Sequence, residues 1–294
     1  MLTETFINQH KLPSVFQQTA KEFYIPLADE IALHQKSAET SYFVGINGCQ
    51  GSGKSTLSDY LKLYLEEKYN LSVIVMSLDD FYYSQDEREI LATDVHPLFK
   101  TRGVPGTHDT SLIKQALEKI KSAQLPVTIP RFNKATDNPY NLSQWTKIDK
   151  QIDIVIFEGW CWGVDAQQES ELEVPVNSLE ALQDKQAIWR NYANTQLMLH
   201  YQPLYKYMDK WVMFKAPSFT DVYAWRLEQE QKLADSLGDK ITDAVMNNEQ
   251  IKNFIQYYQR LTEHSLNTLA DKCEHVYILN SVRKIIEHQR RSEK

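Results

Sequence analysis

The chain has 294 residues, 42% of them hydrophobic and 24% charged, and its formal net charge is −7 at pH 7. This length and apolar content are enough to bury a substantial core, which excludes disordered and fibrous architectures. The negative charge argues against binding to nucleic acid or an anionic membrane through bulk electrostatics, so an anionic ligand would need local donors.

Cysteine usage and apolar runs bear on the compartment. The three cysteines, at positions 49, 161 and 273, show no CxxC or Cys/His ligand spacing, so neither a disulfide framework nor a zinc site is predicted. Residues 1–20 lack the basic and apolar regions of a secretion signal, and no apolar run approaches the ~20 residues that span a bilayer. We expect a cytoplasmic protein, a monomer or weak homodimer, with no nucleic-acid or membrane partner.

The predicted elements alternate between helix and strand. Residues 1–40 form a predicted helical extension, because apolar residues recur there at helical spacing. The apolar run 42–46 predicts a strand that ends in a glycine-rich segment, and a helix follows up to Tyr69. Further strands, with helical stretches between them, are predicted at 73–76, 127–129, 152–157, 211–214 and 276–279. This order predicts a mostly parallel sheet with helices on both faces, in a single domain over residues 1–294 with a mostly helical insertion at 164–208.

Residues 48–55, GCQGSGKS, match the pattern GxxxxGK[ST] between a predicted strand and a predicted helix. Glycines let successive N–H groups point at phosphate oxygens, Lys54 reaches the β- and γ-phosphates, and the Ser55 hydroxyl ligates Mg²⁺. The alternative is a chance glycine-rich turn, which the flanking strand and helix disfavour. We therefore predict an α/β fold of the P-loop NTPase type, a three-layer sandwich. The expected nucleotide-binding residues are Gly48, Cys49, Gln50, Gly51, Ser52, Gly53, Lys54, Ser55 and Thr56.

Acidic residues follow two of the predicted strands. Asp79 and Asp80 come after strand 73–76, at the sheet edge where open α/β folds bind ligands. Phosphorylation of an alcohol needs a carboxylate that orients and deprotonates the hydroxyl, so this position suits a kinase, although an exposed Asp pair that caps a helix is the alternative. Glu158 follows strand 152–157 in the manner of a Walker B acid. We expect it beside Ser55 at the metal, with an ordinary exposed turn residue as the alternative.

Five motifs together resemble the D-glycerate 3-kinase-like P-loop kinases, relatives of uridine kinase, phosphoribulokinase and pantothenate kinase. They are SLDDFY (77–82), TRGVPGTHD (101–109), PRFNK (130–134), VIFEGWCWG (155–163) and WRLEQEQKL (225–233). The resemblance covers roughly residues 40–290. It implies an ATP-dependent kinase for a small hydroxy acid, with conversion of D-glycerate to 3-phosphoglycerate as the first expectation.

The same resemblance implies roles for single residues. Asp79 falls where the nucleoside-kinase relatives carry their catalytic Asp, and Asp80 where they carry Ser, so Asp79 is the expected base. Arg226 resembles the lid arginine of related kinases, on an expected lid helix over residues 219–240 that would close on the γ-phosphate and exclude water. For Arg226, a surface pair with Glu230, four residues further on, is the alternative.

Cationic side chains concentrate in and after the segment 96–109, which has turn residues and little periodicity. A substrate carboxylate needs charge-assisted donors, and an Arg side chain can grip it through two parallel bonds. Pairing within the protein, for example between Arg102 and Asp109, is the alternative for each cation. The expected substrate-binding residues are Asp80, Tyr82, Arg102, His108, Arg131 and Lys134.

Other functions remain in view. A nucleoside kinase or another alcohol kinase is the alternative within the same class, and a regulatory nucleotide switch or GTPase is the alternative from a different class. A GTPase needs an NKxD guanine motif, and residues 133–136 fall one position short of it because Asp137 comes late. An ABC-type ATPase is disfavoured because the chain has no LSGGQ-like segment.

Overall fold

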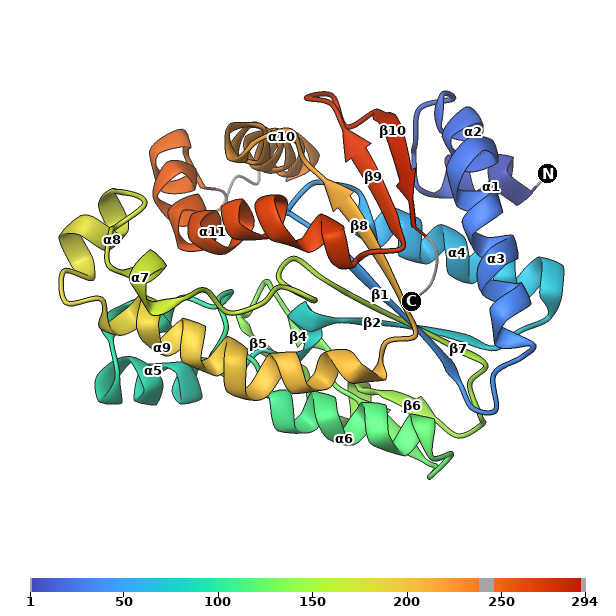
Figure 1. Cartoon of the computed structure of the whole chain (residues 1–294), viewed down its shortest axis with the longest axis horizontal. Helices are drawn as coiled ribbons and strands as arrows, with labels where there is room; N and C mark the ends of the chain where they lie inside the picture. The colour runs from blue at the N-terminus through green and yellow to red at the C-terminus, as the bar shows by residue number, and fades with distance from the viewer. Residues whose placement is uncertain (1, 238–245, 292–294) are drawn as a thin grey trace.

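The computed structural model describes residues 2–237 and 246–291. Its central element is a six-stranded sheet in the order β10-β9-β8-β1-β7-β2, parallel throughout except between β10 and β9 (Figure 1). These strands are β1 (Tyr42–Gly48), β2 (Val73–Ser77), β7 (Ile154–Gly159), β8 (Lys210–Lys215), β9 (His275–Leu279) and β10 (Ile285–Arg290). Two small antiparallel pairs lie outside this sheet: β3 (Val127–Ile129) with β6 (Thr146–Ile148), and β4 (Phe132–Asn133) with β5 (Asn138–Pro139).

Helices cover both faces of the sheet because the crossovers run in two directions. Helix α4 (Lys54–Tyr69) connects β1 to β2 and packs with α3 (Ile25–Gln35) on one face. The connections from β2 back to β7, and from there to β8 and β9, run the opposite way, so right-handed crossovers put their helices on the other face. That face carries α6 (Thr110–Lys121), α9 (Ile188–Gln196) and the end of α11 (Asn248–Thr268) (Figure 1).

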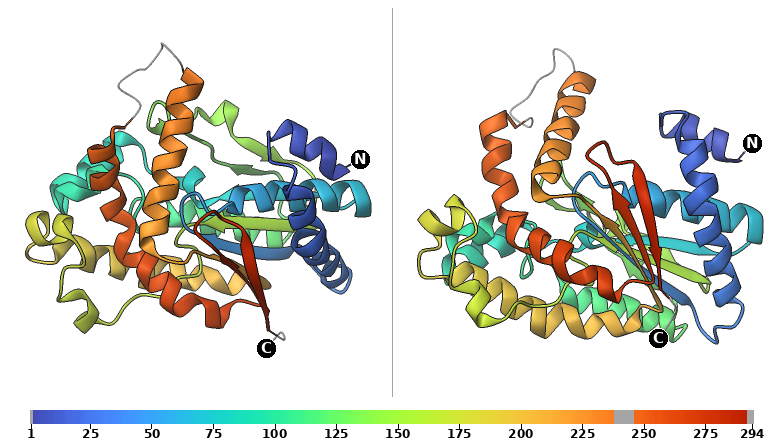
Figure 2. Two further views of the ribbon diagram at one scale, coloured as in Figure 1. Left: turned by 90° about the horizontal axis from the view of Figure 1, so that it is seen from above. Right: turned by 45° about the horizontal axis from the view of Figure 1, so that its top comes forward.

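The other helices lie around this three-layer core, namely α1 (Leu2–Gln9), α2 (Phe16–Thr19), α5 (Gln85–Asp94), α7 (Glu169–Leu172), α8 (Ser178–Gln183) and α10 (Phe219–Leu237). Helix α10 and the first half of α11 stand side by side and project beyond the sheet in both views of Figure 2. Of the expected lid helix at 219–240, residues 238–240 lie outside the described residues. Within residues 2–237 and 246–291, no helix is long and apolar enough to cross a membrane.

The predicted α/β class and mostly parallel sheet are confirmed, and two details differ. Residues 127–129 do form a strand, β3, but it pairs antiparallel with β6 and does not join the central sheet. The sequence analysis also missed β10, whose residues 286–290 are exposed or half-buried and so lack the apolar run that revealed the other strands. The described residues before β1 are helical, as expected: they form α1 and one continuous helical run over residues 16–35, in which a π-helical turn joins α2 to α3.

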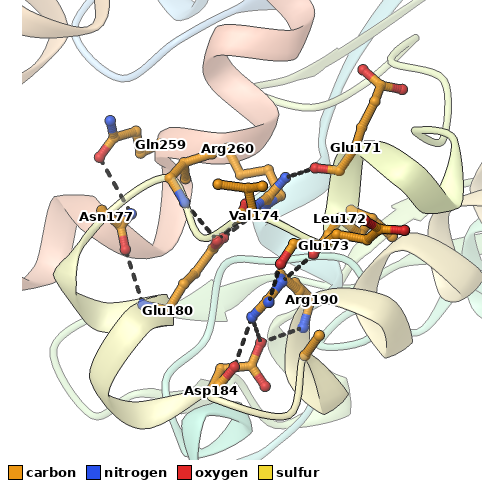
Figure 3. Close-up of polar contacts among 12 residues, drawn as sticks. Glu171, Leu172, Glu173, Val174, Asn177, Glu180, Asp184, Arg190, Gln259 and Arg260 are labelled. Atoms are coloured by element: carbon orange, nitrogen blue, oxygen red, sulfur yellow. Dashed lines mark hydrogen bonds and ion pairs between the residues drawn. The ribbon is translucent and has the colours of Figure 1, made fainter.

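Two buried arginines fasten α7, α8 and α9 to α11. Arg190 on α9 pairs with Asp184 at 2.9 Å, and Arg260 on α11 pairs with Glu180 at 2.6 Å. Between them, the two guanidinium groups donate to the four consecutive carbonyl oxygens of residues 171–174 (Figure 3). These carbonyls lie at and just beyond the end of α7, where a helix has no internal donors to offer them. Arg190 and Arg260 are thus structural residues that hold this part of the chain together.

Candidate functional site

The carboxyl ends of the neighbouring strands β1, β7 and β2 border a cavity of about 280 Å³. The cavity is lined by the loops after these strands, by residues 102 and 134, and by one side of α10 and α11. Its charged lining comprises four cations and two acids, although the whole chain is acidic. The lining residues are Gln50, Gly51, Lys54, Ser55, Ser77, Asp79, Tyr82, Arg102, Lys134, Glu158, Trp160, Arg226, Gln229, Phe254 and Tyr258.

The loop between β1 and α4 turns on two glycines with left-handed backbone, Gly51 at φ +77° and Gly53 at φ +96°. Side chains rarely adopt this conformation, and a Cβ on Gly51 would also lie 2.9 Å from the Cβ of Trp225. Helix α4 begins at Lys54, so the N–H groups of its first turn lack acceptors within the helix. A loop of this kind that leads into a helix N-terminus suits a phosphate group.

Four of the nine residues expected to bind the nucleotide line the cavity: Gln50, Gly51, Lys54 and Ser55. The other five do not line the cavity: Gly48 ends β1, Thr56 lies in α4, and the loop between them contains Cys49, Ser52 and Gly53. Burial raises the pKa of the Cys49 thiol to about 12, so this cysteine stays protonated at neutral pH and is a poor target for oxidation.

Lys54, Ser55 and Glu158 meet where β7 ends beside the P-loop. The Ser55 hydroxyl donates to Glu158 Oε1 at 3.3 Å, and Lys54 Nζ lies 3.7 Å from Oε2. Glu158 is buried, and Ser77 also donates to its Oε1 at 2.9 Å. Burial raises the pKa of Glu158, and the Lys54 charge limits that rise. For Lys54 the carboxylates of Glu158 and Asp79 outweigh the effect of burial and raise its pKa, so the ammonium stays charged.

Asp79 projects from the turn after β2 and receives two hydrogen bonds. Lys134 Nζ donates to Oδ2 at 2.6 Å, and the Tyr82 hydroxyl donates to Oδ1 at 3.0 Å. Burial favours the neutral acid, but the charges of Lys134 and Lys54 outweigh it and hold the pKa of Asp79 well below its usual range. Asp79 is therefore an ionised carboxylate at neutral pH, oriented by a lysine and a phenol at the edge of the cavity.

Asp80, the neighbouring acid, does not line the cavity. It accepts a bond from Arg131 at 2.6 Å and one from the backbone N–H of Phe132 at 3.3 Å. Arg131 in turn donates to the Thr146 hydroxyl at 2.9 Å. Asp80 and Arg131 therefore bind each other and fix the segment that carries Lys134, rather than pointing at the cavity as the sequence analysis expected.

The two cations expected in the 101–109 loop, Arg102 and His108, lie in different surroundings: the first lines the cavity and the second is buried. Arg102 lines the cavity, lies over the Phe132 ring and pairs with Asp137, not with Asp109, the partner named as an alternative. His108 is 1% exposed and lies behind Tyr82, with ring centroids 4.3 Å apart. Burial lowers the pKa of His108 to about 3, which leaves the imidazole neutral. It does not fit the expected role of a cationic donor to a substrate carboxylate.

Arg226 on α10 lines the cavity and also makes the predicted i,i+4 pair. Its guanidinium is 2.6 Å from Glu230, a buried residue whose Oε1 accepts a bond from the backbone N–H of Met246 at 2.8 Å. The guanidinium carbon lies 5.7 Å from the centroid of the Phe254 ring on α11. The two readings of Arg226 are thus compatible, because Glu230 holds the arginine at the cavity.

Comparisons with known proteins agree with this geometry. The family profile described as the KAP family P-loop domain matches residues 24–288. The chain is 33% identical over 244 residues to the uncharacterized kinase mug58 of Schizosaccharomyces pombe, covering 79% of this chain and 83% of that protein. The chain belongs to the KAP family of P-loop domains, among the D-glycerate 3-kinase-like kinases.

Two further relatives support that membership. The chloroplastic D-glycerate 3-kinase of Arabidopsis thaliana is 26% identical over 281 residues, covering 90% of this chain and 58% of that protein. The solved structure of D-glycerate 3-kinase from Cryptococcus neoformans is 25% identical and superposes with a TM-score of 0.74, over 95% of this chain and 100% of that one. The protein is therefore an ATP-dependent phosphotransferase with an alcohol group as acceptor.

The kinase has five cavity residues that the sequence analysis missed, namely Ser77, Trp160, Gln229, Phe254 and Tyr258. Trp160 and Tyr258 hold the 101–109 loop, because the indole N–H donates to the carbonyl of Gly103 at 3.0 Å and the Tyr258 hydroxyl to that of Arg102 at 3.1 Å. Trp160 follows Glu158 in a motif already noted, so its position was a usable signal. Phe254 and Tyr258 lie on an amphipathic helix whose spacing gives no sign that one flank borders the site.

A divalent cation fits beside Ser55 and Glu158. Among residues 2–237 and 246–291, no group of three or more His, Cys, Asp or Glu side chains could hold a metal by itself. Oε2 of the buried Glu158 has no hydrogen-bond partner within the described part of the chain. Carboxylate and hydroxyl oxygens are ligands that Mg²⁺ prefers, and in kinases it takes others from water and phosphate. The donor set therefore suits a cation that arrives with the nucleotide.

Proposed function

We propose that this kinase transfers the γ-phosphate of ATP to a hydroxyl of a small hydroxy acid, with D-glycerate giving 3-phosphoglycerate as the leading case. Support comes from the two relatives named as D-glycerate 3-kinases and from the ionised Asp79, which shares one cavity with the P-loop lysine and further cations. Asp79 is the observation that carries the proposal, because a nucleotide switch has no need of an oriented carboxylate at this edge.

Asp79 acts as the base toward the acceptor. Its carboxylate accepts the proton of the substrate hydroxyl while that oxygen bonds to the γ-phosphorus and the bond to the bridging oxygen of ADP breaks. Tyr82 keeps its phenolic proton, since burial raises its pKa well above the usual value, and so it donates steadily to Oδ1. The two oxygens of Asp79 therefore differ: Oδ2 accepts from the charged Lys134, and Oδ1 accepts from the neutral Tyr82 hydroxyl.

The P-loop and α10 stabilise the transferring phosphoryl group. Lys54 and Arg226, both on the cavity lining, supply positive charge as the phosphoryl group leaves ADP. Ser55 and Glu158 would hold Mg²⁺, which would neutralise phosphate charge and polarise the phosphorus–oxygen bonds. The aromatic residues Trp160, Phe254 and Tyr258 limit the access of water to the reacting group.

The acid group of the substrate is assigned to Arg102 and Lys134. Both line the cavity near Asp79, and both carry charges that a carboxylate would complement. Arg131 and His108 are left out of this grip, because the first is bound to Asp80 outside the cavity and the second is buried and neutral. We expect Arg102→Gln to raise the KM for the hydroxy acid and to leave the KM for ATP nearly unchanged.

The test is a coupled ADP-release assay with ATP and Mg²⁺ over D-glycerate, L-glycerate, other hydroxy acids, pantothenate and uridine. Asp79→Asn should bind ATP normally but lose about 10²- to 10⁴-fold in turnover, the usual contribution of a general base. The matched control is Asp94→Asn, at an exposed aspartate in the last turn of α5, which should match the wild type. Turnover of uridine without glycerate would replace the proposed substrate by a nucleoside, and near-normal turnover by Asp79→Asn would reject the assigned base.

A further inference from the structure

Tyr201 is a buried tyrosine, 0% exposed, that contacts the 101–109 loop without lining the cavity. It lies in the helical turn Leu197–Tyr201 that continues α9. Its hydroxyl accepts the backbone N–H of Gly106 at 3.2 Å and shares a 2.7 Å hydrogen bond with Nδ1 of His108. In either tautomer of the histidine, this bond to Nδ1 fixes the orientation of the imidazole ring.

His108 carries this orientation forward to Tyr82. Their rings stack with centroids 4.3 Å apart and planes 26° apart, and the two residues are also joined by an antiparallel backbone bridge. Tyr82 has a second ring contact, edge-on to Phe132 at 5.3 Å. The phenol therefore sits between two rings, and its hydroxyl is aimed at Asp79, to which it donates at 3.0 Å.

We propose that Tyr201 and His108 are positioning residues: they hold the Tyr82 ring in place and so hold Asp79 in the orientation that phosphoryl transfer needs. Neither residue lines the cavity, so they act through Tyr82 and do not touch the substrate. The inference rests on the proposed function, since it takes Asp79 as the base. It gives a purpose to the histidine of the TRGVPGTHD motif and to a tyrosine in the 164–208 segment.

A neutral histidine suits this task better than a charged one. Lys134 and Lys54 already lower the pKa of Asp79, and a third cation would lower it further and make the carboxylate a weaker base. Burial keeps His108 uncharged throughout the working range of a kinase. The neutral ring then stacks on Tyr82 and makes one hydrogen bond to Tyr201 without adding a positive charge near Asp79.

The test measures steady-state kinetics of the full chain with ATP and its hydroxy acid for Tyr201→Phe, His108→Phe and the double variant. Loss of one buried hydrogen bond should lower kcat about five- to tenfold and leave the KM for ATP within roughly twofold. Because both changes break the same bond, the double variant should lose little more than either single variant, which a double-mutant cycle detects.

Tyr205→Phe is the matched control. Tyr205 is a tyrosine four residues further along the same segment, and its hydroxyl donates to the carbonyl of Val164 at 2.9 Å. It should lose a comparable amount of thermal stability while its kcat stays near that of the wild type. The positioning role is wrong if Tyr201→Phe lowers kcat no more than Tyr205→Phe does. It is also wrong if the effects of Tyr201→Phe and His108→Phe on kcat are additive in free energy.

Tyr82→Phe keeps the test valid should His108→Phe fail to fold, because it removes only the hydroxyl that holds Asp79. Its kcat should fall by at least as much as that of Tyr201→Phe, and a wild-type kcat would overturn the inference. Asp79→Asn separates the two proposals. If Asp79→Asn is inactive while Tyr201→Phe and His108→Phe are normal, only the positioning role fails, whereas an active Asp79→Asn removes the base on which both rest.

Discussion

The ionisation of Asp79 should depend on Lys134, and replacing that lysine by methionine tests it. Lys134→Met keeps most of the length of the side chain and removes the charge 2.6 Å from Asp79 Oδ2. A base must be ionised to accept a proton, so a lowered pKa keeps Asp79 active as the pH falls. Removing the cation raises that pKa, and activity should then be lost at a higher pH than in the wild type.

The size of the effect follows from geometry and solvent exposure. An adjacent opposite charge lowers a carboxyl pKa by about one to three units. The Lys134 side chain is 61% exposed, so water screens part of its field, and Lys54 remains nearby after the substitution. We therefore expect the lower part of that range, a rise of about one to two units, or about 1.4 to 2.7 kcal/mol of differential stabilisation of the carboxylate.

The assay is the pH dependence of kcat/KM, which reports ionisations of the free enzyme. A weaker grip on the substrate acid would lower kcat/KM at every pH, whereas the change at Asp79 moves the acid limb itself. Lys147→Met is the control, because this lysine is also 61% exposed and also pairs with an aspartate, Asp149, away from Asp79. An acid limb that stays in place in Lys134→Met, or moves to lower pH, would refute the reasoning.

Two further outcomes are expected. Arg260→Met should leave Glu180 buried without its partner and reduce the free energy of unfolding by about 3–5 kcal/mol, seen as a fall in Tm, while Lys232→Met in an exposed pair should change it by no more than about 1 kcal/mol. A loss below about 1 kcal/mol for Arg260→Met would contradict this account. Arg226→Ala should lower kcat more than it weakens ATP binding, measured by turnover and by nucleotide titration, and the reverse pattern would count against a role in phosphoryl transfer.

The parts of the site that lie next to strands in the sequence were predictable. Parallel strands bring their carboxyl ends to one edge, so the P-loop, Asp79 and Glu158 had to meet once the strands were recognised. Apolar runs reveal such strands because both faces of the sheet are covered. The same rule misplaced residues 127–129, since a buried strand in a small antiparallel pair has the same apolar signature as one in the central sheet.

The partners of the cationic side chains were harder to predict, because the sequence shows that a charge is present but not which acid it pairs with. Asp80 and Arg131 are 51 residues apart and bind each other, while Arg102 and Lys134 reach the cavity. Histidine is ambiguous in the same way: a buried His108 is an uncharged ring, and nothing in TRGVPGTHD distinguishes it from an exposed donor. Tyr201 and Tyr258 come from helices whose apolar spacing reports only that they pack against something.

The chain has few glycines, and at Gly103 the structure shows why a glycine is needed. The chain has nine glycines, where average usage of about 7% would give roughly twenty. Gly103 has φ +139°, and a Cβ there would lie 2.3 Å from the hydroxyl oxygen of Tyr258.

That close approach lets Tyr258 reach the carbonyl of Arg102 and Trp160 reach that of Gly103 itself, while Tyr201 binds the backbone of Gly106. Three aromatic side chains from separate segments, two of them donors and Tyr201 an acceptor, thus hold one loop by its backbone. The motif TRGVPGTHD is better understood as a loop shaped to present Arg102 than as a cluster of substrate-binding cations.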